Sequence, residues 1–233
     1  MQQPFYVKYL TVTNHIPFQL DPEDKDNNFT TTDTSNTTIN NYFETAHYLD
    51  QSIKEFFDYL KKSGLDKNTM VILYGDHYGV GSSDDELSAL APVLGKDFNN
   101  WTSYDTAELQ KVPFMIHMDG IKGKVDNKIS GEIDVLPTLL HLLGILNKNY
   151  IQFGQDLFSK QYRQVVVFRN GTIITPKYVI IGGKGTKGTV YNQQTGEKIT
   201  KFNKKQKEEI NKLASYGRTS LHYSDLLNNH NLL

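Results

Sequence analysis

The chain has 233 residues, no cysteine, and 25 Lys plus Arg residues against 26 Asp plus Glu residues. This length can bury a sizeable core, the lack of cysteine excludes disulfides, thiolate metal sites and a cysteine nucleophile, and the balanced charge argues against nucleic acid as a partner. The sequence shows neither a long apolar run for a membrane span nor the layout of a signal peptide, so we expect this chain by itself to be soluble.

The first 145 residues predict strands and helices in alternation. Strands are expected where short apolar runs occur, at residues 5–13, 69–74 and 113–118. Helices are expected at 42–63, 87–94, 104–110 and 135–143, with Asp134 as an N-cap and with Gly64 and Gly144 as C-terminal caps. The polar stretch 21–41 is interpreted as a long exposed loop. This alternation predicts an α/β fold with a mostly parallel central sheet covered by helices.

The last third of the chain has a different pattern. Residues 165–169 and 173–181 flank Asn170-Gly171, which predicts a β-hairpin with a two-residue turn. A strand near 189–192, a charged helix over 202–216 and a polar tail follow. We therefore expect two regions, an α/β domain over residues 1–160 and a small antiparallel β subdomain over 161–233 packed on the same domain.

An acid and an imidazole follow the apolar run VILYG, at Asp76 and His77. In open α/β sheets, ligands gather beyond the carboxyl ends of the strands. Carboxylate oxygen and imidazole nitrogen are suitable ligands for Zn²⁺, Mn²⁺ or Mg²⁺, so the pair predicts part of a metal site. Turn chemistry at a strand end explains the same two residues without any metal, and two ligands are too few for a stable site.

His15 follows the first predicted strand in TVTNHIPF, where it can face the same crevice and bind a phosphate oxygen or a metal. The alternative is a loop histidine that only ends the strand. No G-x-S-x-G motif occurs, which argues against an α/β-hydrolase. The run GGKGTKG at 182–188 has the composition of a phosphate loop but not its residue order, and is interpreted as a basic, Gly-rich turn.

Three stretches together resemble a known family: TVTNHIPF, VILYGDHYG, and GEIDVLPTLLHLLGI at 131–145. They are similar to the extracellular catalytic domain of the lipoteichoic acid synthases, phosphoglycerol transferases of the alkaline phosphatase/sulfatase superfamily. The segments ETAHYLDQSIKEFF, YIQFGQDLF and FRNGTIITPKY match as well, so the resemblance covers most of the chain.

The resemblance implies a mechanism and a location. In this family a threonine bound to a divalent cation, usually taken to be manganese, attacks the headgroup phosphorus of phosphatidylglycerol, and poly(glycerol phosphate) then accepts the group. Asp76 and His77 match two metal ligands, and His15 matches a histidine that contacts the substrate phosphate. The full-length protein is expected at the extracellular face of the bacterial membrane, anchored by N-terminal helices, with no nucleic acid as partner.

The sequence also departs from the family pattern. The nucleophilic threonine, a glutamate ligand and the membrane helices precede the region that corresponds to residue 1. We therefore expect the chain to be the second half of the catalytic domain, to bind Mn²⁺ weakly or not at all, and to be inactive alone. Gly81 replaces a serine expected near the substrate, and Ser82 is the candidate to take its place.

Two alternatives remain open from the sequence. The first keeps the fold and changes the reaction to hydrolysis, as in sulfatases or phosphodiesterases. The second is a non-catalytic module that binds glycerol phosphate polymers through His15 and the loop at 21–41.

Overall fold

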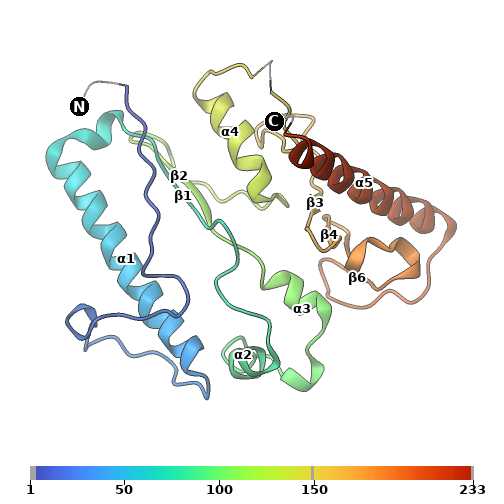
Figure 1. Ribbon diagram of the computed structural model, residues 1–233, viewed down its shortest axis with the longest axis horizontal. Coiled ribbons are helices and arrows are strands. Elements are labelled where there is room, and N and C mark those ends of the chain that lie inside the picture. The colour runs from blue at the N-terminus through green and yellow to red at the C-terminus, as the bar shows by residue number, and fades with distance from the viewer. Residues whose placement is uncertain (1–3, 148–149, 232–233) are drawn as a thin grey trace. The chain divides into compact units, whose positions relative to one another are not determined.

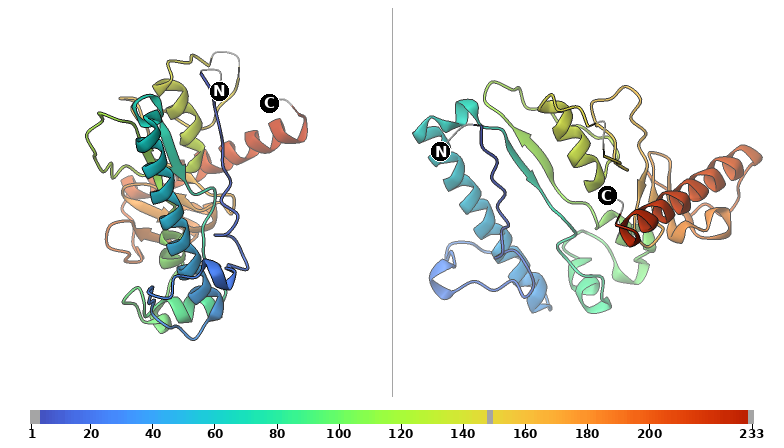
Figure 2. Two further views of the ribbon diagram at one scale, coloured as in Figure 1. Left: turned by 90° about the vertical axis from the view of Figure 1, so that its left-hand side faces the viewer. Right: turned by 45° about the horizontal axis from the view of Figure 1, so that its top comes forward.

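A computed structural model describes residues 4–147 and 150–231 of the chain (Figures 1 and 2). The chain divides into two compact units, residues 1–102 with 109–123, and residues 103–108 with 124–233. Each unit has a sheet of its own and is described by itself. The expected subdomain at 161–233 falls inside the second unit, and the division at residue 160 stays a prediction.

The first unit is built around one long helix. Its elements are α1 (Thr37–Ser63), α2 (Asp84–Leu90), the strands β1 (Val71–Tyr74) and β2 (Phe114–His117), and 3₁₀ turns at Pro22–Asp24, Leu65–Asn68 and Phe98–Asn100. The predicted helix at 42–63 is confirmed, but it begins at Thr37. The reason is that the Asn36 side chain caps it by accepting from the N–H of Ile39, a fully buried residue. Gly64, with φ of 72°, ends it as expected.

The predicted parallel sheet is not found among the residues that the structure describes. β1 and β2 pair antiparallel, with Val71 opposite His117, and the strands of the second unit are also antiparallel. The predicted strand at 5–13 runs extended without a strand partner in the described chain (Figure 1), and Tyr6 and Val12 are 83% and 78% exposed. An apolar run favours an extended backbone, but a strand also needs a neighbour for its N–H and C=O groups.

The second unit joins a small sheet to three helices. Its elements are α3 (Ser103–Glu108), α4 (Val135–Leu142), α5 (Lys204–Asn229), the strands β3 (Val166–Val167), β4 (Ile173–Ile174), β5 (Tyr178–Ile180) and β6 (Val190–Asn192), and 3₁₀ turns at Glu132–Asp134, Ile181–Gly183 and Gly185–Lys187. The sheet has the order β3-β4-β5-β6. The predicted hairpin between β3 and β4 is present, but its turn is longer than the expected two residues. The Gly171 N–H donates to the Phe168 carbonyl at 2.9 Å, and Gly171, with φ of 82°, takes the left-handed conformation while Asn170 does not.

Two predictions for this unit were wrong in extent. The predicted strand at 173–181 is two strands, because Pro176 interrupts it and the Thr175 hydroxyl accepts from the N–H of Tyr178 to form a turn.

The predicted polar tail is helical to Asn229 (Figure 2). Gly217 does not end α5 but allows it to approach β4 closely, since a Cβ there would lie 2.7 Å from Ile173 Cδ1. Among the described residues, no helix has the length and apolar character needed to cross a membrane.

Asp134 was expected to cap α4, but its side chain makes no cap hydrogen bond. The carboxylate is instead buried, at 4% exposure, and accepts from the N–H of Gly131 (3.1 Å), the N–H of Gln155 (2.7 Å) and the hydroxyl of Tyr162 (2.8 Å). Burial and the nearby carboxylate raise the pKa of Tyr162 well above its ordinary value, so the phenol keeps its proton and remains a donor.

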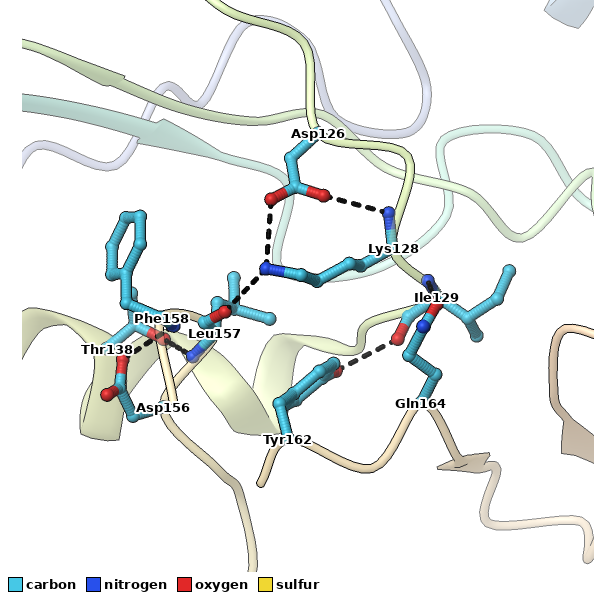
Figure 3. A network of polar contacts seen from close by, with 9 residues as sticks. All are labelled: Asp126, Lys128, Ile129, Thr138, Asp156, Leu157, Phe158, Tyr162 and Gln164. Atoms are coloured by element: carbon cyan, nitrogen blue, oxygen red, sulfur yellow. Dashed lines mark hydrogen bonds and ion pairs between the residues drawn. The ribbon is translucent and has the colours of Figure 1, made fainter. Parts of the chain in front are cut away.

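Further hydrogen bonds fasten the segment after α4 to the helix and to the residues that precede it (Figure 3). The Thr138 hydroxyl donates to the Asp134 carbonyl (2.6 Å) and accepts from the N–H of Leu157 (3.1 Å). Lys128 Nζ donates to the Leu157 carbonyl (2.8 Å) and pairs with Asp126 (3.1 Å). The GEIDVLPTLL and FGQDLF stretches therefore meet in a structural network.

Candidate active site

The His15 turn is held by α1. The N–H of Phe18 donates to the His15 carbonyl at 2.7 Å, which closes the turn. Phe18 is buried, at 4% exposure, and its ring lies edge-on to Tyr42 with centroids 5.3 Å apart. Next to His15, Asn14 accepts a hydrogen bond of 3.1 Å from the hydroxyl of Thr45, a fully buried residue of α1. The turn is therefore fixed on both sides of His15.

The Asp76-His77 loop rests on the same helix. It begins at Gly75, whose N–H donates to the Pro113 carbonyl at 3.0 Å. Gly79 lies against Tyr42 so closely that a Cβ would meet the ring at 2.6 Å. Tyr42 therefore contacts both the loop and the His15 turn. The roles of Tyr42 and Thr45 were not predicted, and no spacing or motif marks them, because these roles depend on how the helix packs.

The structure brings His15 and His77 together. Their rings meet edge to face with centroids 6.2 Å apart, and His77 Nε2 lies 3.8 Å from Asp76 Oδ1. His15 Nδ1 contacts the Ile16 carbonyl (2.9 Å) and His77 Nδ1 contacts the Tyr78 carbonyl (2.8 Å). A carbonyl oxygen only accepts, so each Nδ1 carries the hydrogen, and in the neutral rings each Nε2 keeps its lone pair.

The Asp76 carboxylate and the His77 imidazole are ligands of the kind that a divalent cation prefers, but two ligands are too few to hold one. The side chains of Asp76 and His77 are 71% and 59% exposed, so both remain available to a ligand. One carboxylate and one imidazole match the preferences of Mn²⁺ or Zn²⁺. Within residues 4–147 and 150–231, however, no group of three or more His, Cys, Asp or Glu side chains is arranged to hold a metal. The metal role of Asp76 and His77 and the phosphate role of His15 stay predictions.

Gly81 lies against Glu86, with no room for a side chain. A Cβ at Gly81 would lie 2.2 Å from Glu86 Oε2. The Glu86 carboxylate is held there by the Ser83 hydroxyl (2.6 Å), in the capping box that starts α2. A serine at position 81 would therefore displace Glu86. Ser82 is exposed, and its proposed contact with substrate stays a prediction.

Comparisons with known proteins agree on one family. The Sulfatase family profile matches residues 1–145. Lipoteichoic acid synthase 2 of Bacillus subtilis is 43% identical over 100% of this chain and 33% of its own length, and lipoteichoic acid synthase of Staphylococcus aureus is 40% identical over 90% of this chain and 31% of its length. The crystal structure of the lipoteichoic acid synthase LtaP from Listeria monocytogenes superposes with a TM-score of 0.67 at 29% identity, and covers 91% of this chain and 52% of that one.

The chain thus spans about a third of the length of the curated relatives that it matches. The family resemblance found in the sequence is confirmed by the profile and by the structural similarity to LtaP. Since the profile covers more than half of the 233 residues, the chain belongs to the sulfatase family.

Proposed function

We propose that the chain is part of a metal-dependent phosphoglycerol transferase, which moves glycerol phosphate from phosphatidylglycerol to a growing lipoteichoic acid chain. The observation that carries the proposal is the arrangement of His15 and His77, two imidazoles that contact backbone carbonyls through Nδ1 and so leave Nε2 to face a ligand, with His77 Nε2 3.8 Å from Asp76 Oδ1. The similarity to lipoteichoic acid synthases supports the reaction class.

Each of these side chains has a proposed role. Asp76 and His77 Nε2 would hold a divalent cation, Mn²⁺ by the family pattern, which when bound would polarise the phosphoryl oxygens and lower the pKa of the attacking hydroxyl. In its protonated form His15 donates from Nε2 to a phosphate oxygen, and its Nδ1 contact with the Ile16 carbonyl fixes the direction of that bond. Ser82 would contact the headgroup in place of the serine that Gly81 replaces.

The remaining parts of the site would come from a longer protein at the extracellular face of the membrane. The chain covers about a third of its curated relatives, and the proposed nucleophilic threonine, further metal ligands and membrane helices have no assigned counterpart in it. The exposed apolar segment at 5–13 would then pair as a strand of a mostly parallel sheet completed by the rest of the protein. Alone, the chain would not turn over.

The test uses the full-length protein with fluorescent phosphatidylglycerol and Mn²⁺, and measures release of diacylglycerol. We expect Asp76→Asn and His15→Ala to lower turnover by roughly 100-fold or more, the usual effect of removing a group that stabilises developing charge. Asp50→Asn, a change of the same chemistry at an exposed position of α1, should leave turnover unchanged. Wild-type rates in Asp76→Asn would refute the proposal, and release by the 233-residue chain alone would refute its inactivity.

A further inference from the structure

The Gly-rich turn at 181–188 is fastened to α5. Three of its glycines, Gly182, Gly183 and Gly185, have φ of 64°, 66° and 59°, a left-handed conformation that glycine adopts without strain. Asn211 Oδ1 on α5 accepts from the N–H and the hydroxyl of Thr186 at 3.1 and 3.2 Å. Arg218 Nη1, further along the helix, donates to the Gly183 carbonyl at 2.7 Å. The turn is therefore a fixed surface.

Two adjoining hollows lie where this turn meets α5. The first has a volume of about 330 Å³ and is lined by Lys184, Thr186, Lys187, Asn211, Ala214 and Arg218. The second has a volume of about 510 Å³ and is lined by Thr186, Thr200, Lys201, Phe202 and Lys207. Because they share Thr186, they form one feature, which we call the basic groove. Its lining contains five cations and no acid.

Within the described chain, the fold does not use the cations of the basic groove as ion pairs. The acids of α5 that pair with cations do so elsewhere, Glu209 with Lys177 at 2.8 Å and Asp225 with Arg169 at 2.6 Å. The four lysines of the groove are exposed. Since the whole chain has a net charge of −1, the groove is a local concentration of positive charge, which favours an anion.

We propose that the basic groove binds successive phosphates of a phosphodiester polyanion. Each hollow has cations of its own, which suits a chain of charges better than one phosphate. The Thr200 hydroxyl and the side-chain NH2 of Asn211 add donors for the intervening oxygens. Only Ala214 and Phe202 are apolar, so the groove lacks the surface needed for insertion into a lipid bilayer. The identity of the polymer, poly(glycerol phosphate), rests on the proposed function.

The test is a fluorescence anisotropy titration of the 233-residue chain with end-labelled synthetic glycerol phosphate oligomers. The variant Lys187→Gln/Lys207→Gln removes one cation from each hollow. We expect it to weaken binding by about threefold to thirtyfold, the sum of two exposed charge contacts, and to flatten the dependence on salt. Thermal unfolding checks that the variant folds as the wild type does.

Two control variants show whether binding depends on the groove itself. Lys205→Gln/Lys212→Gln makes the same charge change on exposed positions of α5 outside the groove, and should change binding less than twofold. His222→Ala, at an exposed position of α5 outside the groove, should bind as the wild type does.

Three results would overturn the inference: equal losses in the two lysine variants, oligomers that bind no better than inorganic phosphate, or binding only to phosphatidylglycerol vesicles. The titration needs no turnover. Failure of the transferase assay would therefore leave a positive titration standing, as polyanion binding without the proposed reaction, and a negative titration would leave the transferase proposal intact.

Discussion

Asp134 in the second unit and Asp76 in the first unit differ in burial and in the hydrogen bonds that their carboxylates accept. Asp134 is 4% exposed and accepts three hydrogen bonds from within the second unit. The Asp76 side chain is 71% exposed, and its partner in the first unit is His77 at 3.8 Å. A carboxylate satisfied by internal donors stabilises the fold and has little left for a ligand. An exposed carboxylate such as that of Asp76 contributes little to stability, and its oxygens remain available to a ligand.

The largest expected effect is on the buried carboxylate. Asp134→Asn replaces one accepting oxygen by an amide donor, which then faces the N–H or O–H groups that Asp134 accepts from. We expect the free energy of unfolding to fall by about 3–5 kcal/mol, because hydrogen bonds to charged groups contribute about 1.5–3 kcal/mol each. Urea unfolding measures it. A loss below about 1 kcal/mol would show that the network is not what holds the segment after α4.

A smaller effect is expected where the open loop touches its support. In Gly79→Ala the new Cβ would lie 2.6 Å from the Tyr42 ring, so the loop or the ring must move. We expect this to lower the free energy of unfolding by about 1–3 kcal/mol. Gly123→Ala is the matched control, since nothing lies within 4 Å of a Cβ there. The His15 and His77 ring signals in NMR spectra should shift in Gly79→Ala only. Unchanged signals would contradict the role of Tyr42 as common support.

Local patterns predicted most of the elements. Helix α1, its end at Gly64 and the Asn170-Gly171 hairpin depend on residues close in sequence, and all three are present. The pairing of strands was not predictable in the same way, because the run at 5–13 fixes an extended backbone but not its neighbour. The Asp134 network was also missed, since its donors Gln155 and Tyr162 come from a segment whose docking on α4 has no periodic signal.

The candidate site was predictable in its chemical residues but not in its support. His15, Asp76 and His77 were singled out by their positions after apolar runs, and the structure brings the two imidazoles together. Tyr42 looked like the first residue of an amphipathic helix, and its contact with Gly79 depends on packing between elements. The effect of Gly81 could be assessed only once Glu86 was seen in the adjacent space.

The pH dependence of the buried network gives a third test. The pKa of Tyr162 is raised above its ordinary value of 10.0, mainly by burial and then by Asp134. Below pH 10 the phenol is neutral in both states. As the pH rises above about 10 the unfolded phenol ionises while the folded one keeps its proton, so stability is lost.

Tyr162→Phe removes the hydrogen bond to Asp134, and it also removes the fall in stability above pH 10, because phenylalanine does not ionise. At pH 7 we expect the variant to be about 1–2 kcal/mol less stable than the wild type. This gap should shrink as the pH rises above 10, as measured by urea unfolding at a series of pH values. Tyr223→Phe, at a 56% exposed position, should show no such convergence. A constant gap would mean that the phenol is not protected from ionisation in the folded chain.

The smallest expected effect is on the open carboxylate. Asp76→Asn should change the free energy of unfolding by less than about 0.5 kcal/mol, because an exposed contact with His77 is screened by water. If Mn²⁺ binds the wild-type chain with a Kd near 1 mM, then 1 mM Mn²⁺ stabilises it by about 0.4 kcal/mol, and Asp76→Asn should lose this gain. Paramagnetic broadening of the His15 and His77 ring signals, present in the wild type and absent in the variant, is the more sensitive measurement. A carboxylate whose loss leaves folding unchanged but removes the broadening is held for a ligand, whereas a large loss of stability without Mn²⁺ would make Asp76 a structural residue like Asp134.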